Sequence, residues 1–132
     1  MITMKELLGA HDIKECNDVQ RVNLVILLDR LNKLRKDWGK PMVITSGFRN
    51  DDDMKRIYKS DNYPKKSKHL FGQAADISDP KLELYNWLIA DNCKKLKEHG
   101  FWMESGTTNW VHLQIVPMGS YNPKTDVRVF KP

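Results

Sequence analysis

The chain has few cysteines and no long apolar run, and these absences exclude several classes of protein. Its two cysteines, Cys16 and Cys93, belong to no CxxC pair. Neither fits a zinc knuckle or a disulfide framework, and two free thiols suit a reducing cytosol. No run approaches the roughly 20 apolar residues of a membrane helix, and the N-terminal stretch lacks the apolar core of a signal peptide. We therefore expect synthesis in the cytoplasm without a signal peptide, and no membrane insertion.

Length and composition indicate one soluble domain over residues 1–132. Hydrophobic residues make up 40% of the chain and charged residues 30%, which is typical of a globular protein rather than a disordered one. Lysine and arginine exceed aspartate and glutamate by 22 to 17, a net charge of +5. Such a charge is common on a solvated surface, but it also suits a polyanion such as nucleic acid or a bacterial cell wall. No predicted helix carries a dense basic face with interleaved aromatic residues, so we expect no nucleic-acid partner.

Helical and strand periodicities together predict an α+β fold, with helices packed on a largely antiparallel sheet. Long helices are predicted over 18–37, beginning at Asp18, and over 80–98, opened by Asp79-Pro80; a short one covers 51–60. Strands are predicted over 42–45, 72–78, 101–105, 110–116 and 126–130. The residues expected to be buried are Val22, Val25, Ile26, Leu28, Leu31 and Leu34 in the first long helix and Leu82, Tyr85, Trp87, Leu88 and Leu96 in the second.

Three predicted strands each carry a polar residue opposite an apolar set. Successive side chains of a strand point to opposite faces. In 110–116 the aliphatic residues alternate with His112, and Glu104 and Asp76 stand in the same relation to the apolar residues of their strands. If the apolar sets share one core, these three polar side chains share the other face. With 105–109 as a hairpin loop, we expect Glu104 to pair near Trp110 and to lie diagonal to His112, about 7–8 Å away.

Each candidate site residue also has an ordinary structural interpretation. His69 alone is typical of an exposed loop, Asp76 of a salt bridge, and His112 of a hydrogen-bonded core histidine. Together, two histidines and an aspartate make the three-ligand set of a catalytic zinc site, although the ligand types leave other first-row metals open. Arg49 is either a surface ion-pair partner or a guanidinium that binds a carboxylate or a developing oxyanion.

The motifs resemble those of a known enzyme family. Residues 67–76, SKHLFGQAAD, resemble the SxHxxGxAxD signature of the zinc D-Ala-D-Ala carboxypeptidase and L-alanyl-D-glutamate endopeptidase family. Residues 110–112 resemble the WxH of that family, and residues 46–49, SGFR, its SGxR segment. Order and spacing agree over residues 43–114. Hedgehog-type signalling domains share this fold, but the small chain is more similar to bacterial or phage wall peptidases.

The resemblance implies a zinc ion held by His69, Asp76 and His112. It implies that Arg49 binds substrate carboxylate or stabilises the oxyanion and that Ser67 supports the site by hydrogen bonding. Trp110 and Gln114 flank the second histidine, and we expect them to support the site or bind substrate. The chain departs from the family at Asn109, because many relatives carry the catalytic glutamate close before that histidine. Glu104 is the nearest carboxylate, and we assign it the role of general base.

The expected function is hydrolysis of peptide bonds in the peptidoglycan stem by a monomeric phage or prophage enzyme of the endolysin type. It would reach the cell wall after release by a holin or by delivery in a virion. If Glu104 points elsewhere, the alternative is a non-catalytic zinc-containing module that binds the wall or forms part of a virion. A basic nucleic-acid-binding protein is a third reading, and its binding would be sensitive to salt but not to a chelator.

Overall fold

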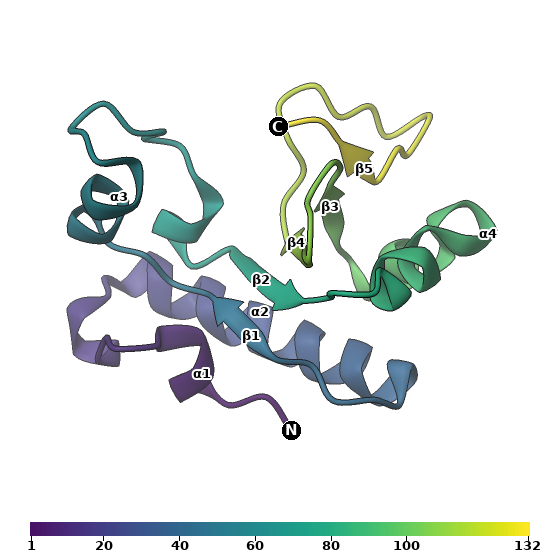
Figure 1. Cartoon of the computed structure of the whole chain (residues 1–132), viewed down its shortest axis with the longest axis horizontal. Coiled ribbons are helices and arrows are strands. Elements are labelled where there is room, and N and C mark those ends of the chain that lie inside the picture. Colours follow the sequence, from purple (N-terminus) through teal and green to yellow (C-terminus); the bar gives the residue numbers. More distant parts are fainter.

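A five-stranded sheet forms the centre of the structure, with its strands in the order β1-β2-β4-β3-β5 (Figure 1). The computed structural model describes all residues from Met1 to Pro132. The strands are β1 (Ile44–Ser46), β2 (Ala74–Ser78), β3 (Trp102–Glu104), β4 (Trp110–Gln114) and β5 (Val129–Phe130). Neighbouring strands are antiparallel except β3 and β5, which are parallel. The predicted α+β class with a largely antiparallel sheet is confirmed.

Four α-helices and two short 3₁₀ helices surround this sheet (Figure 1). They are α1 (Met4–Leu8), η1 (Ile13–Glu15), α2 (Asp18–Trp38), α3 (Asp51–Tyr58), η2 (Lys68–Phe71) and α4 (Glu83–His99). The sequence predicted α2, α3 and α4 but neither α1 nor the 3₁₀ helices, which are too short to show a hydrophobic period. None of the helices combines the length and the apolar character needed to cross a membrane.

The main core lies between α2, α4 and one face of the sheet. Helix α2 contributes four leucines that are fully buried, Leu24, Leu27, Leu31 and Leu34. They pack with alternate residues of the strands, such as Ile77 of β2 and Val111 and Leu113 of β4. Each fully buried leucine stabilises the fold by about 1.5–3 kcal/mol relative to an exposed one. The opposite face of these strands is left for polar side chains.

The predicted buried face of α2 is wrong in part. Val22 and Val25 are each 59% exposed and Ile26 is 36% exposed, whereas Leu24 and Leu27 occupy the core. Apolar residues lie on more than one side of this helix, so periodicity alone did not fix which stripe faces the sheet. Leu31 and Leu34 belong to both stripes and are buried as predicted.

The two long helices begin at different residues from those expected. Asn17, not Asp18, caps α2, because its side chain accepts a hydrogen bond from the Gln20 amide in a reciprocal capping box. Helix α4 begins at Glu83 rather than residue 80. Asp79 still provides hydrogen-bond acceptors for the first turn of α4, because the Asp79 carboxylate accepts hydrogen bonds from the amides of Leu84 and Tyr85.

Helix α4 also differs from the expected continuous helix in its burial and its backbone. Leu82 lies outside it and is 41% exposed, while Leu88 and Leu96 are buried as predicted. Residues 90–93 interrupt the helix with non-helical backbone angles. The helix therefore covers the core as two shorter helical segments.

Candidate metal centre

Asp76 and His112 face each other across the two central strands. They are direct register partners in the antiparallel pair of β2 and β4. Asp76 Oδ1 lies 3.0 Å from His112 Nδ1, and both side chains are buried. Ala75 and Leu113, their sequence neighbours, point into the core on the other face. The alternation of a pleated strand therefore places one carboxylate and one imidazole together on the face opposite the core.

The 3₁₀ helix η2 brings His69 to the same point. Its Nε2 atom lies 3.4 Å from Asp76 Oδ1. The turn back into β2 is made by Gly72, which has φ of +71°, and a Cβ atom there would lie 2.9 Å from the Gln20 carbonyl oxygen. Only glycine avoids both the strained backbone angle and this close approach. The glycine of the motif thus sets the position of His69 against the strand.

The far nitrogen of each imidazole is held by a hydrogen-bond acceptor. His69 Nδ1 lies 2.7 Å from the carbonyl oxygen of Gly47, so this nitrogen must donate its hydrogen. His112 Nε2 lies 2.9 Å from Gln114 Oε1, and the Gln114 amide nitrogen donates to the carbonyl of Val116. Gln114 is thereby oriented with its oxygen toward the imidazole. Each histidine in its neutral form then presents a lone pair, not a hydrogen, to Asp76.

When both imidazoles are neutral, the atoms of His69, Asp76 and His112 that face one another all carry lone pairs, and none of them carries a hydrogen. One ligand atom from each of His69, Asp76 and His112 lies within 4.8 Å of the other two. Such a group requires a cation, either an added proton or a metal ion. Donors bound tetrahedrally at about 2.0–2.2 Å from zinc are roughly 3.3–3.6 Å apart, and Asp76 Oδ1 lies 3.4 Å from His69 Nε2 and 3.0 Å from His112 Nδ1. A carbonyl or amide behind each imidazole is also the usual partner of a metal-ligating histidine. The residues present suit a zinc ion.

The electrostatics of the cluster keep Asp76 ionised. Burial raises the pKa of its carboxyl, but the hydrogen bonds and positive charge that His112 and His69 supply when they are protonated outweigh this and hold the pKa well below its usual range. Burial lowers the pKa of His112, whereas the neighbouring Asp76 carboxylate raises it, and the net pKa is above the ordinary value. The centre thus offers a permanent negative charge and two imidazoles with affinity for a cation.

Arg49 contacts the other oxygen of the same carboxylate. Its Nη2 lies 3.2 Å from Asp76 Oδ2, and its Nε donates to Ser46 Oγ at 2.9 Å. Arg49 therefore does form an ion pair, but its partner is Asp76 of the cluster and not a residue elsewhere on the surface. With its side chain 18% exposed, Arg49 orients Asp76 and also borders the open side of the cluster.

Glu104 lies on the same face, in a different register from the one expected. Trp102 pairs with Gln114 and Met103 with Leu113, and continuing this register puts Glu104 directly opposite His112. The predicted pairing of Glu104 near Trp110 is wrong by two residues. The connection between β3 and β4 extends beyond the expected loop 105–109 into the first residues of β4. Glu104 Oε2 lies 4.0 Å from His112 Nδ1. The carboxylate is thus beside the three converging donors.

Asn109 has a structural role that a glutamate would perform less well. It adopts a left-handed backbone with φ of +71°, a conformation that asparagine tolerates better than most residues. Its carbonyl oxygen accepts a hydrogen bond from the Asp79 amide at 2.8 Å. Asn109, three residues before His112, therefore leads the chain into β4, and the carboxylate near the cluster is that of Glu104 in the neighbouring strand β3.

The remaining predicted residues lie at the edges of the centre. Gln114 is buried and orients His112. Trp110 is 39% exposed on the same face of β4 and so lies open to a bound ligand. Ser67 precedes η2, where its carbonyl accepts from the Leu70 amide, and its hydroxyl makes no hydrogen bond. Its expected support of the site stays a prediction.

Sequence reasoning missed two groups at this centre. The Gly47 carbonyl is a backbone atom, and no sequence pattern marks which carbonyl will meet a histidine. Phe130 of β5 was assigned no role, yet its ring centroid lies 6.3 Å from that of His112. Alternation in DVRVF hinted that Val129 and Phe130 face opposite ways, but the strand paired with β5 is set only by the fold.

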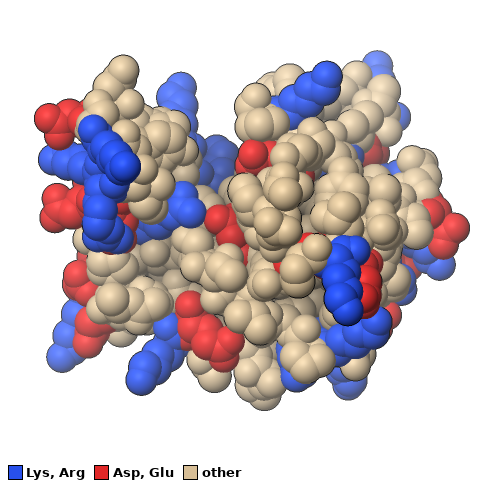
Figure 2. All heavy atoms as spheres, viewed as in Figure 1, with Lys and Arg blue, Asp and Glu red and all other residues tan.

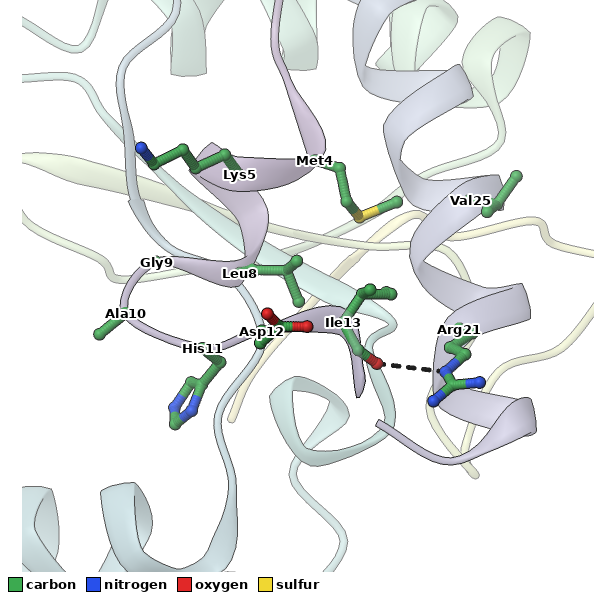
Figure 3. A pocket seen from close by; sticks show the side chains of 10 residues that line it. All are labelled: Met4, Lys5, Leu8, Gly9, Ala10, His11, Asp12, Ile13, Arg21 and Val25. Atoms are coloured by element: carbon green, nitrogen blue, oxygen red, sulfur yellow. Dashed lines mark hydrogen bonds between the residues drawn. The ribbon is translucent and has the colours of Figure 1, made fainter. Parts of the chain in front are cut away.

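Two other features of the surface lack this chemistry. Asp37, Glu98 and His99 also lie close together, but Asp37 is already paired with both Lys95 and His99 in an exposed position. A hollow of about 640 Å³ lies between α1, η1 and α2 and is lined largely by apolar side chains such as Met4 and Val25 (Figure 3). It contains no set of three metal donors. The buried cluster on the sheet is the candidate centre.

The surroundings of this centre form a notch in the molecular surface. In Figure 1 the loop after α3 rises on one side of β2 and β4 and the C-terminal segment on the other. Figure 2 shows the notch between these two parts, with many lysine and arginine side chains on the α3 side. The segment from 55 to 68 carries six of them: Lys55, Arg56, Lys59, Lys65, Lys66 and Lys68.

Comparison with known proteins identifies a family. Residues 2–114 match the family model described as Peptidase M15. No curated protein matches the chain. The matched range contains His69, Asp76, His112, Arg49 and Glu104, and it ends before β5.

Proposed function

The chain belongs to the peptidase M15 family, a family of metal-dependent peptidases, and from this we propose that it is a zinc peptidase that hydrolyses peptide bonds in the peptidoglycan stem. The observation that carries the proposal is the convergence of three potential metal ligands, His69, Asp76 and His112, with a further carboxylate beside them. His69, Asp76 and His112 would hold the ion. When bound, zinc polarises a scissile carbonyl and lowers the pKa of water.

Glu104 is the residue that would move protons in this reaction. It lies 4.0 Å from the donor atom of His112, within reach of a water molecule held at the cluster. Its carboxylate would accept the proton of the attacking water and deliver it to the leaving amine. The carboxylate has no lysine or arginine partner within ion-pair distance, so it is available as a base.

Arg49 and the basic rim would bind the substrate. The guanidinium of Arg49 keeps Asp76 in place through one nitrogen and borders the cluster, where a carboxylate or a developing oxyanion would contact it. Stem peptides carry several carboxylates, and lysine and arginine side chains gather on the α3 side of the notch (Figure 2). Attraction between them would favour association at low ionic strength.

We place the enzyme among phage or prophage endolysin-like proteins that act on the bacterial wall, after release by a holin or delivery in a virion. The three potential ligands and the neighbouring Glu104 suit either a carboxypeptidase or an endopeptidase. The products of cleavage distinguish these two, because a carboxypeptidase releases one terminal residue and an endopeptidase releases longer fragments.

The test is digestion of purified peptidoglycan with mass analysis of the released peptides. The zinc-loaded protein should release stem-peptide fragments, and Glu104→Gln should lose at least about a hundredfold of this activity while keeping its zinc. His99→Ala, which removes a partly buried histidine at the end of α4, away from the centre, is the matched control and should remain active. Zinc binding without fragments, in both wild type and Glu104→Gln, would support the non-catalytic module instead.

A further inference from the structure

Helix α2 carries a stripe of exposed apolar side chains on the side that faces away from the core. Its members are 36–64% exposed, and we call them the outer face of α2: Val19, Val22, Val25 and Ile26. At about 100° per residue, their mean direction lies roughly 150° around the helix from that of the four buried leucines. Single exposed apolar residues are ordinary, but several gathered on one helix face indicate an interaction surface.

The apolar surface continues from this face into the hollow between α1, η1 and α2. Val25 lines the hollow together with Met4, Leu8 and Ile13. Figure 3 shows Met4 and Ile13 beside α2. A helix packed along the outer face of α2 would therefore also contact side chains of α1 and η1.

Opposite charges stand at the two ends of the outer face. The side chain of Asp18 is 100% exposed at the start of α2, and that of Lys33 is 68% exposed near the other end. They are separated by about 22 Å along the helix. The midpoint between the two positions falls between Val25 and Ile26, within the apolar stripe. The charges are thus placed symmetrically about the apolar centre.

This arrangement is complementary to a second copy of itself. When two such helices cross antiparallel about a twofold axis at the midpoint, Asp18 of each copy meets Lys33 of the other, and the apolar residues pack between these two pairs. A parallel pair would instead place like charges together. An anionic membrane surface is a poor partner, because Asp18 and Asp29 would repel it.

The outer face of α2 lies on the far side of the protein from the candidate metal centre. The leucines of α2 pack on one face of the sheet, whereas Asp76 and His112 stand on the opposite face. In Figure 1, α2 runs behind β1 and β2. Pairing through the outer face of α2 therefore leaves the centre of each copy open.

We propose that two copies of this chain associate through the outer face of α2, antiparallel about a twofold axis near Val25 and Ile26. Burial of the valine and isoleucine side chains stabilises the pair, and the two contacts between Asp18 and Lys33 set its direction. This dimer takes the place of the monomer expected from the sequence.

Sedimentation equilibrium over micromolar to millimolar protein tests the association, and it needs neither metal nor substrate. Wild type should approach twice the mass of one chain. Val25→Asp should raise the dissociation constant by at least about thirtyfold, because two carboxylates would meet near the twofold axis. Val127→Asp, at a position 57% exposed in the C-terminal segment, should associate as wild type does. A wild type that keeps the mass of one chain throughout, or equal association of Val25→Asp and wild type, would overturn the proposal.

A charge exchange tests the antiparallel direction. Asp18→Lys and Lys33→Glu should each weaken association by about fivefold, since each places like charges together at both ends of the interface. The double variant restores opposite charges and should return to within about twofold of wild type. No recovery in the double variant, or no loss in the single ones, would overturn the antiparallel pairing.

Discussion

His112 and Asp76 are direct partners across β2 and β4, with Nδ1 and Oδ1 3.0 Å apart, and neither atom has a hydrogen to give the other when the imidazole is neutral. The contact is therefore stable only with a cation between them. This relation explains why a buried carboxylate is tolerated in a strand whose other residues are apolar.

Replacing Asp76 tests the need for a charged ligand. Asp76→Asn keeps the shape of the side chain but removes the negative charge, so zinc affinity should fall by at least about a hundredfold. Zinc per chain after dialysis against a weak chelator measures the loss. His99→Ala should retain about one zinc per chain, and full retention by Asp76→Asn would contradict the assignment.

Gln114 should matter for the metal although it is not a donor to it. Gln114→Ala removes the acceptor that fixes His112 Nε2–H, and loss of such a partner typically costs 10–100-fold in metal affinity. Chelator competition measures the change. The control is Gln73→Ala, just before β2, whose side chain makes no hydrogen bond; equal affinities for the two variants would argue against the role of Gln114.

Gly72 should be sensitive to even a single methyl group. Gly72→Ala forces φ of +71° on an alanine and places its Cβ 2.9 Å from Gln20 O and Leu24 Cγ, so the free energy of unfolding should fall by about 1–3 kcal/mol. Urea denaturation provides the measurement. Gly119→Ala has no atom within 4 Å and no positive φ, and should change stability by less than about 0.5 kcal/mol.

The ion pair between His11 and Asp53 predicts a pH-dependent stability. His11 Nε2 lies 2.5 Å from Asp53 Oδ2 and ties the loop after α1 to the start of α3. Burial lowers the pKa of His11, but Asp53 and Glu15 raise it above its ordinary value of 6.5. Burial raises the pKa of Asp53, but the Asn50 amide, His11 and Arg56 together lower it below 3.8.

These opposite shifts define the pH window. The His11 contribution is complete below pH 6.5 and is lost as the pH rises through its higher folded pKa, while the Asp53 contribution is present above pH 3.8 and is lost below it. His11→Gln should therefore lower the melting temperature at pH 5.5 more than at pH 8.5. Lys14→Gln, an exposed neighbour, should show no such difference; a pH-independent loss in His11→Gln would refute the ion pair.

The sequence predicted the site better than it predicted the packing around it. The residues of SKHLFGQAAD and WVH carry their chemistry in their identity and spacing, and strand alternation alone put Asp76, Glu104 and His112 on one face. Burial of α2 was less predictable, because Val22 and Val25 compete with Leu24 and Leu27 for the core and a helix that is apolar on several sides has no single preferred face.

The α+β class, the family and the residue types that gather at the centre could be predicted from the residues alone, since they follow from periodicity, motif spacing and donor chemistry. The register that puts Glu104 opposite His112, the Gly47 carbonyl that meets His69 and the Phe130 ring beside His112 became known only from the folded structure. Each of these depends on which backbone lies next to which, and non-local strand pairing is set by the packing of the whole sheet rather than by the residues of one strand.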